Sequence, residues 1–423
     1  MANLKTKLKL LLSDRALRNR LLFVLAVFIL FRLGAAIPVP GVDQTALARF
    51  FAGNQFFGLL NVFSGGGFSS LSIFMLGVGP FITASIILQL LTIMVPSLKA
   101  MYQEEGEAGR RKFAQYSRLL TVPLAALQAF GFLVLFERQG IITSLGWGSQ
   151  ALNVLTIVAG SVLLMWLGEL ISEYGIGNGV SLLIFAGIVA DWPNSLGQLV
   201  VNYEPSQIPI YLAFLAVIVV VIAGVVAVTE AERPIPVTYA KRVRGMKVYG
   251  GVSTYLPIRL NQAGVMPIIF ALSILLFPQM LANFLAKVNY GLVQTIANGV
   301  LGLLSNSWFY AGAYFILVFV FTYFYSAITF DPESMAENLQ KNGAFVPGIR
   351  PGRPTAEYVG KVLYRLTLVG AIFLGLVAML PILIQAWTGL SALAIGGTAL
   401  LIVVSVALDT MKQIDSQLSL REY

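Results

Sequence analysis

The most constraining feature of this chain is a pair of long apolar segments that glycine and proline interrupt. Residues 77–91 read GVGPFITASIILQLL, and residues 164–190 read LMWLGELISEYGIGNGVSLLIFAGIVA. Such runs predict helices in a lipid bilayer, where lipid cannot hydrogen-bond the backbone groups that a break releases. Breaks at this depth are tolerated only beside other protein or beside a water-filled path. The sequence therefore predicts helices that do not face lipid alone.

Composition places the whole chain in a membrane. Hydrophobic residues make up 57% of the 423 residues and charged residues 11%, whereas soluble domains carry about 25% charged residues. Because a span needs roughly 20 apolar residues, we predict an all-α polytopic membrane protein with about ten transmembrane helices and no separate soluble domain. The basic N-terminal segment lacks a small-residue cleavage site, so we expect it to be retained. The predicted spans lie near residues 21–38, 75–96, 118–136, 152–172, 178–201, 208–230, 262–286, 309–330, 364–386 and 390–409.

Lysine and arginine gather in alternate connecting segments, which predicts the orientation of the chain. Of the 28 Lys and Arg residues, 24 lie in five segments: residues 1–20, 99–118, 231–261, 331–365 and those after 410. Segments rich in these residues resist crossing the membrane, so we expect them and both chain termini on the cytoplasmic side. Two cytoplasmic termini require an even number of spans.

The predicted spans divide into two sets of five at a short link between Pro205 and Pro209. We therefore expect an N-terminal half at residues 1–207 and a C-terminal half at residues 208–423. Five is odd, so the second half enters the membrane with its ends reversed. Any structural repeat between the halves is then an inverted one. This symmetry rests on the span count, because the halves show no convincing residue-level similarity.

The chain contains neither cysteine nor histidine. This excludes thiolate chemistry, Ser-His-Asp triads, imidazole proton relays and metal sites built on Cys or His. The ionisable residues in the predicted spans are chiefly Arg32, Glu169 and Asp409, each near a helix end where a long side chain can reach the interface. The sequence shows no series of midplane acids of the kind that ion-coupled pumps use. We expect no catalytic residue, no metal site and no cofactor.

Two glycine-rich motifs each allow a functional and a purely structural interpretation. Residues 61–80, NVFSGGGFSSLSIFMLGVGP, contain an apolar run too short to cross a membrane. This run is either a half-helix that dips into the membrane from outside or a flexible surface loop. Residues 175–181, GIGNGVS, predict a tight turn that positions the next helix.

Apolar pairs one helical turn apart accompany both motifs. Val78 and Ile82 form the first pair, and Val180 and Ile184 form the second. Such pairs are typical of a protein core or a lipid-facing surface, and they also occur along a pore.

Two predicted cytoplasmic loops, at 231–261 and 331–363, are longer than orientation alone requires. The first mixes basic side chains with tyrosines, and the second carries Arg350 and Arg353 on a run of glycine and proline. Basic residues interleaved with aromatic ones can bind a nucleic-acid backbone or an acidic protein surface. The alternative is that these loops only enforce orientation.

In combination, these segments resemble the SecY family of protein-conducting channels over nearly the whole chain. The order and spacing of the matching segments carry the resemblance, because each segment alone is weak. They are FRLGAAIPVPGVD at 31–43, NVFSGGGFSSLSIF at 61–74, GVGPFITASIILQLL at 77–91, MWLGELISEYGIGNGVSLLIFAGIVA at 165–190, YAKRVRG with STYLPIRLNQAGVMPIIFA at 239–271, KNGAFVPGIRPG at 341–352 and GGTALLIVV at 396–404. The resemblance implies a clamshell of two five-helix halves around a central pore, and no enzymatic activity.

The resemblance also implies roles for particular residues. The pore would narrow to an apolar ring of Val78, Ile82, Val180, Ile184, Ile269 and Ile402. A plug, a short helix that seals the outer funnel, would lie near 61–73 and include Phe63, Ser64, Gly65, Gly66, Gly67, Phe68, Ser69 and Ser70. The spans near 75–96 and 262–286 would part as a lateral gate toward lipid. Gln89 and Asn261 would be polar residues in these gate helices, and the alternative role for both is ordinary interhelical hydrogen bonding.

The partners implied by the resemblance are the SecE and SecG subunits, the motor ATPase SecA, the ribosome with its RNA, signal peptides, secretory and membrane-protein precursors, and the lipid bilayer. SecA and the ribosome would dock on the two basic loops, at Lys241 and Arg242 in the first and at Arg350 in the second. Tyr255 stands where the family commonly has histidine, which puts details of these contacts in question. The expected location is the bacterial inner membrane.

Two functions from other classes remain open from sequence. A secondary transporter of a small solute would explain broken helices and an inverted repeat equally well, but it would need a polar site at the midplane. An intramembrane hydrolase would need a set of catalytic residues.

Overall fold

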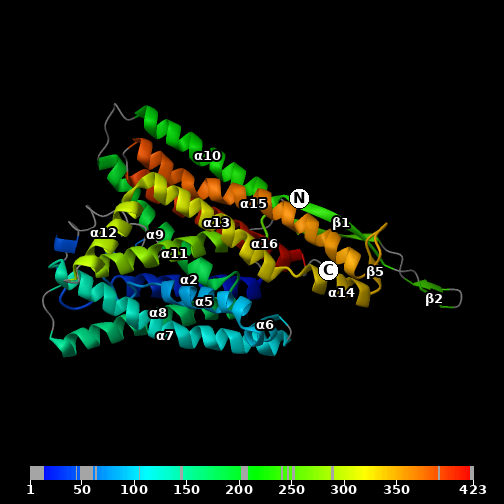
Figure 1. The fold of residues 1–423 in the computed structure, drawn as a ribbon, viewed down its shortest axis with the longest axis horizontal. Coiled ribbons are helices and arrows are strands. Elements are labelled where there is room, and N and C mark those ends of the chain that lie inside the picture. The colour runs from blue at the N-terminus through cyan, green and yellow to red at the C-terminus, as the bar shows by residue number, and fades with distance from the viewer. Residues whose placement is uncertain are drawn as a thin grey trace. The chain divides into compact units, whose positions relative to one another are not determined.

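The computed structural model describes residues 14–43, 45–47, 61, 64–103, 105–142, 146–201, 208–239, 242–244, 247–249, 253–286, 290–388 and 391–419. The chain is mostly helical, which confirms the predicted fold class (Figure 1). Its contacts define two compact units. Unit 1 comprises Met1–Ile208, Met280–Ala297 and Leu390–Tyr423, and unit 2 comprises Pro209–Gln279 and Asn298–Gly389. The symmetric halves at 1–207 and 208–423 stay a prediction.

Unit 1 is a set of helices, most of which pack against their neighbours in sequence. They are α2 (Arg15–Ala35), α5 (Gly79–Met94), α6 (Pro96–Gln103), α7 (Gly106–Arg138), α8 (Trp147–Tyr174), α9 (Gly179–Val201) and α16 (Ser391–Ser419). α5 packs against α7, α7 against α8, and α8 against α9. α9 also packs against α16, and α2 contacts both α8 and α9. α9 is therefore held by three helical neighbours, α2, α8 and α16.

A sharp elbow follows α5. The axes of α5 and α6 differ by 115°. Val95, between them, has an extended backbone, which a residue before proline prefers. α6 then packs along α7, where the ring centroids of Tyr102 and Phe113 are 4.9 Å apart.

Unit 2 combines helices with strands. It contains α13 (Ser307–Thr329), α14 (Pro332–Lys341), α15 (Arg353–Thr388) and nearly all of α10 (Ile208–Glu230). α11 (Met266–Leu285) and α12 (Gly291–Ser305) have residues in both units. α13 runs along α15, where Ser326 Oγ and Thr367 Oγ1 are 3.0 Å apart.

Two small sheets complete unit 2, and the sequence did not lead us to expect them. Strands β1 (Glu232–Tyr239), β4 (Ser253–Arg259) and β5 (Ala344–Phe345) form one antiparallel sheet in the order β4-β1-β5. β2 (Arg242–Arg244) and β3 (Lys247–Tyr249) form a separate hairpin. Because β5 comes from the second basic loop, the sheet joins both loops into one folded element. Its apolar face packs on the start of α15 through Ile235, Ile258, Val346, Val359, Val362 and Leu363.

Proline fixes the hydrogen-bonding phase of this sheet. Pro234 pairs with Pro257 and Pro236 with Tyr255. These must be the pairs that exchange no hydrogen bonds, since proline has no N–H. The Leu260 N–H donates to the Ala231 carbonyl at 2.8 Å, which gives the same phase. The backbone edges at Pro234, Pro236 and Pro257 therefore point away from the β1–β4 seam.

Several described helices are suited to a bilayer. Four helical segments are long and apolar enough to cross a membrane: Gly106–Glu137, Trp147–Tyr174, Ser307–Lys341 and Arg353–Ile384. The bent pair α5 and α6 is a fifth candidate. Further apolar helices of 10–17 residues coincide with other predicted spans, at Gly179–Ala190, Leu215–Glu230 and Met266–Leu275, whereas a fourth, Gly291–Ser305, lies between two predicted spans. The count of ten spans stays a prediction.

Candidate functional site

The six proposed ring residues occupy helix starts and helix interiors. Five belong to unit 1: Val78 at the N-cap of α5, Ile82 in α5, Val180 and Ile184 in α9, and Ile402 in α16. Ile269 belongs to unit 2 and lies near the start of α11. All except Val180 are buried, and Val180 is partly buried. Their common role as a ring stays a prediction.

A glycine crossing sets the α8–α9 hairpin that carries Val180. The Gly179 α-carbon lies so close to the Gly168 carbonyl that a β-carbon there would overlap that oxygen. Ser172 Oγ accepts a hydrogen bond from the Gly179 N–H at 2.9 Å and donates to the Gly168 carbonyl at 3.1 Å. Gly177, at φ +98°, turns the chain between the two helices. The predicted turn is thus present, and it fixes Val180 against α8.

The proposed plug segment differs from the short helix that the resemblance implies. Residues 64–78 form consecutive turns instead, with Gly65, Gly66 and Gly77 at positive φ. These glycines favour turns because they adopt the left-handed region at no steric cost. Phe63 lies outside the described residues. Ser64, Gly65, Gly67 and Phe68 are buried, Gly66 and Ser70 are partly buried, and Ser69 is exposed, so the segment is not a surface loop.

The plug segment meets α9 backbone to backbone. A β-carbon on Gly187 would overlap the Gly65 α-carbon and come within 3.1 Å of the Gly65 nitrogen. Gly65 also lies against the Phe31 ring of α2, since a β-carbon on Gly65 would overlap both that ring and the Gly187 α-carbon. Gly187 follows Ile184 by three residues, so the plug segment contacts α9 one turn from a proposed ring residue.

Short backbone pairing ties the next part of the segment to the chain after α2. The Val39 N–H donates to the Leu71 carbonyl at 2.8 Å, and the Ile73 N–H donates to the Ile37 carbonyl at 3.0 Å. Ser70 Oγ donates to the Ala35 carbonyl at 2.9 Å. Leu71 itself has φ +42°, an unfavourable value for leucine. Packing and pairing together hold this residue in place.

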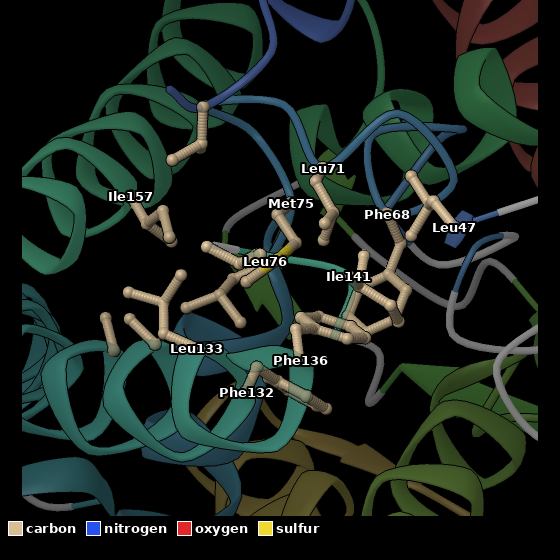
Figure 2. Close-up of a cluster of buried hydrophobic side chains, with 14 residues drawn as sticks. Leu47, Phe68, Leu71, Met75, Leu76, Phe132, Leu133, Phe136, Ile141 and Ile157 are labelled. Carbon is tan, nitrogen blue, oxygen red and sulfur yellow. The ribbon is translucent and has the colours of Figure 1, made fainter. Parts of the chain in front are cut away.

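A buried apolar cluster anchors the plug segment on α7 (Figure 2). The Phe68 ring centroid lies 5.0 Å from that of Phe132 and 5.7 Å from that of Phe136, both edge to face. Leu71 and Met75 enter the same cluster, and each is 1% exposed. Burial of these apolar side chains stabilises the seated segment.

The two proposed gate residues have different settings. Gln89 lies within α5, as predicted. Asn261 does not lie in a helix, which corrects the prediction: it sits in the turn between β4 and α11. Its Nδ2 donates to the Gly264 carbonyl at 3.2 Å and so closes that turn. Gln89 Oε1 and Asn261 Oδ1 are buried without a hydrogen-bond partner among the described residues.

The proposed docking residues lie on or beside the strands. Arg350 is exposed after β5, and its carbonyl accepts a hydrogen bond from Thr355 Oγ1 at 2.8 Å. Arg242 begins β2, and Lys241 lies outside the described residues. Tyr255 on β4 is 68% exposed. The sheet therefore holds Arg350 and Tyr255 in one folded element, although they come from loops far apart in sequence.

Sequence reasoning missed two contacts at the candidate site. Gly187 contacts the proposed plug segment, but nothing in the sequence separates it from the other 39 glycines. Glu169, which we expected to reach the interface, instead forms an ion pair with Arg118 of α7. A charged residue on each of two neighbouring predicted spans was the available signal.

These features define a polytopic helical membrane protein that encloses an irregular, glycine-seated segment among its helices. The SecY family model matches residues 72–411. The chain is 46% identical over 419 residues to the protein translocase subunit SecY of Thermus thermophilus, covering 96% of this chain and 94% of the relative. The chain therefore belongs to the SecY family.

Solved structures share the fold. One described as the structure of a protein conducting channel aligns with a TM-score of 0.64 at 21% identity, covering 93% of this chain and 91% of that one. Sec61 in the canine ribosome-channel complex aligns with a TM-score of 0.61 at 20% identity, covering 93% and 91%.

Proposed function

We propose that this chain conducts unfolded polypeptides across the membrane and releases hydrophobic segments sideways into lipid. It is the channel subunit of a protein translocase and is not an enzyme. Family membership over nearly the full length supports this function. The observation that carries the residue-level proposal is that all six ring positions are aliphatic, five of them buried. A transporter of small polar solutes would need polar groups there.

An aliphatic ring suits the passage of a polypeptide. It offers no fixed hydrogen bond that would retain a passing chain, and a narrow apolar constriction stops ions by dewetting. The plug segment, seated on Gly187 and anchored at Phe68, adds a second barrier at rest. If the helices at 75–96 and 262–286 part, a segment of the passing chain can enter lipid, and its hydrophobicity decides whether it does. In lipid each central Leu or Ile gains about 0.3–0.6 kcal/mol, and each central Lys or Asp costs about 2.5–3.5 kcal/mol.

The first test places a single cysteine in the ring. Because the chain has no native cysteine, Ile402→Cys supplies its only thiol. A stalled secretory precursor with its own single cysteine is expected to form a disulfide with Ile402→Cys, read by gel mobility. The control is Ile29→Cys on α2, because the native Ile29 is 63% exposed. Failure at both sites, with the precursor engaged, would overturn the pore assignment and favour solute transport.

The proposed partners follow from the family and from the basic loops. We infer that SecE and SecG complete the channel, and that SecA and the ribosome dock on the two basic loops, at Lys241 and Arg242 in the first and at Arg350 in the second. The canine Sec61 relative is part of a ribosome-channel complex, which supports the ribosome as a partner. The lysine and arginine distribution supports a cytoplasmic position for both loops and both termini in a bacterial inner membrane.

Substituting Arg350 is expected to weaken ribosome binding in a salt-dependent way. Arg350 is exposed and Thr355 holds its backbone carbonyl, so its side chain is free to meet a phosphate of ribosomal RNA. Arg350→Gln should reduce the slope of log affinity against log salt by about 0.7–0.9, the contribution of one phosphate contact. Binding is measured by co-sedimentation at several salt concentrations. Lys341→Gln is the control, because Lys341 is 3.1 Å from Glu337 on the same loop. Equal slopes for both variants would contradict the docking role.

A further inference from the structure

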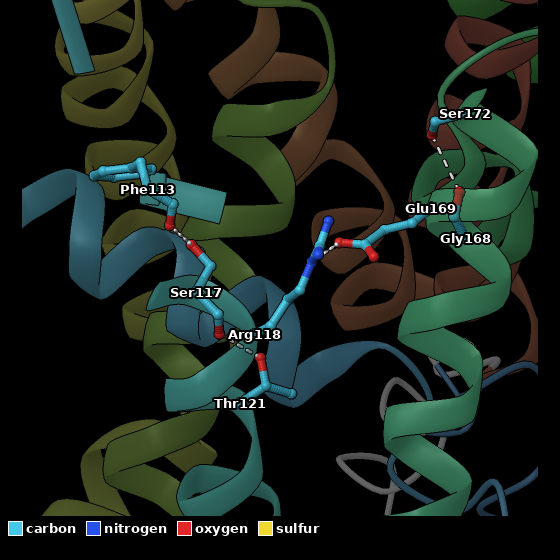
Figure 3. A network of polar contacts seen from close by, with 7 residues as sticks. All are labelled: Phe113, Ser117, Arg118, Thr121, Gly168, Glu169 and Ser172. Atoms are coloured by element: carbon cyan, nitrogen blue, oxygen red, sulfur yellow. Dashed lines mark hydrogen bonds and ion pairs between the residues drawn. The ribbon is translucent and has the colours of Figure 1, made fainter. Parts of the chain in front are cut away.

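An ion pair joins α7 to α8 beside the glycine crossing of the α8–α9 hairpin. Arg118 Nε donates to Glu169 Oε1 at 2.6 Å (Figure 3). The Glu169 side chain is 25% exposed and that of Arg118 is 46% exposed. A charge-assisted hydrogen bond this short is stronger than a neutral one, and partial burial limits its screening.

In this network the Arg118–Glu169 ion pair is the polar link between α7 and α8. Ser117 and Thr121 are buried, but their hydroxyls bond to carbonyls of α7 itself, at Phe113 and Ser117. These bonds close the α7 backbone without reaching α8. Arg118 alone of these side chains extends from α7 to α8 in Figure 3.

The position of Glu169 connects the pair to the ring. Glu169 directly follows Gly168, whose carbonyl contacts Gly179 and also accepts from Ser172. A β-carbon on Gly168 would lie 3.3 Å from Val180 Cγ2, so this part of α8 packs tightly against the start of α9. Movement of α8 at Glu169 must therefore move Val180, and with it Ile184 one turn later.

We propose that Arg118 and Glu169 are positioning residues that set the width of the constriction by holding the α8–α9 hairpin against α7. This inference rests on the proposed function, because it gives Val180 and Ile184 their pore role. With the pair intact, the hairpin has one position and the ring closes tightly around a passing chain. With like charges at the two sites, α8 moves away from α7 and the ring leaks.

The test is a charge swap in the complete translocase in proteoliposomes. Chloride flux is measured with a precursor stalled in the channel, so that the plug does not limit the flux. Arg118→Glu and Glu169→Arg, each alone, should raise this flux by about tenfold, because a hydrogen bond between charged groups is lost and repulsion replaces it. The double variant R118E/E169R restores an opposite pair and should return the flux to within about twofold of the parent protein.

Matched controls separate positioning from general damage. Arg111 and Glu107 form an ion pair within α7 at 3.4 Å, with both side chains highly exposed. Arg111→Glu should leave the flux unchanged. Glu169→Gln retains an oxygen acceptor for Arg118 without the charge, so it should give an intermediate flux even if a reversed variant fails to accumulate.

Two results would overturn the inference. One is a flux in Glu169→Gln and Arg118→Glu equal to that of Arg111→Glu, and the other is a leak that the swap does not reduce. Disulfide formation between Ile402→Cys and the precursor is scored in parallel. If this disulfide forms while the flux is unchanged, only the positioning role fails. If it does not form even with Arg118 and Glu169 intact, the channel assignment itself is contradicted.

Discussion

Replacing Gly187 by alanine is expected to unseat the plug segment and to let ions through the resting channel. The added methyl group would overlap the Gly65 backbone, and Gly65 is also packed against the Phe31 ring. Gly65 also has φ +67°, so the segment cannot easily adopt another backbone conformation there. Overpacking of this kind costs typically about 1–3 kcal/mol. That corresponds to about a 5- to 150-fold shift from the seated to the unseated state.

This substitution should not harm folding. Alanine is favoured over glycine by about 1 kcal/mol in a helix interior, so α9 itself gains stability. The measurement is chloride permeability of resting proteoliposomes, together with export of precursors that carry weakened signal sequences. Gly197→Ala, on the same helix, is the control because a β-carbon there meets nothing within 4 Å. Equal permeability of the two variants would show that Gly187 is not the plug seat.

Truncating Phe68 to alanine is expected to weaken the seated plug from its other side. Phe68 is 1% exposed and packs edge to face on Phe132 and Phe136. Loss of a buried phenylalanine costs about 3–5 kcal/mol. Every 1.4 kcal/mol is a factor of ten, so the displaced state should gain more than about 100-fold in relative population.

Thiol labelling reads this displacement directly. Ser64 is 2% exposed in the seated segment, so Ser64→Cys should react slowly in the parent background and much faster with Phe68→Ala. Phe130→Ala supplies the control, since Phe130 lies on α7 near the same cluster but is 44% exposed. A labelling rate in Phe68→Ala that matches this control would mean that the cluster does not hold the plug.

The sequence was informative wherever short-range chemistry decides the outcome. The GIGNGVS turn and the helices on either side of it follow from local glycine and apolar patterns, and the structure confirms them. The prediction of a short helix at the plug segment was wrong. Three consecutive glycines and the tertiary contacts of Phe68 and Leu71 favour turns there. Asn261 was placed in a helix that in fact begins five residues later, at Met266.

Long-range contacts account for the remaining differences. The sheet pairs Thr238 with Phe345, and no local pattern specifies a partner about a hundred residues away. The Gly65–Gly187 contact and the Arg118–Glu169 pair likewise join distant segments. A single sequence shows which residue types are present, but it does not show which glycines meet or which charges pair.

The prolines of the three-stranded sheet also affect how the protein behaves toward its own cargo. The N–H and C=O groups of an unfolded polypeptide are not paired within the chain, and a free strand edge is a template that can bind such a chain. Pro234, Pro236 and Pro257 remove donors from the outward-facing edges of β1 and β4. With fewer donors at these edges an added strand would pair less strongly, so we expect unfolded chains that pass the sheet to be captured less readily.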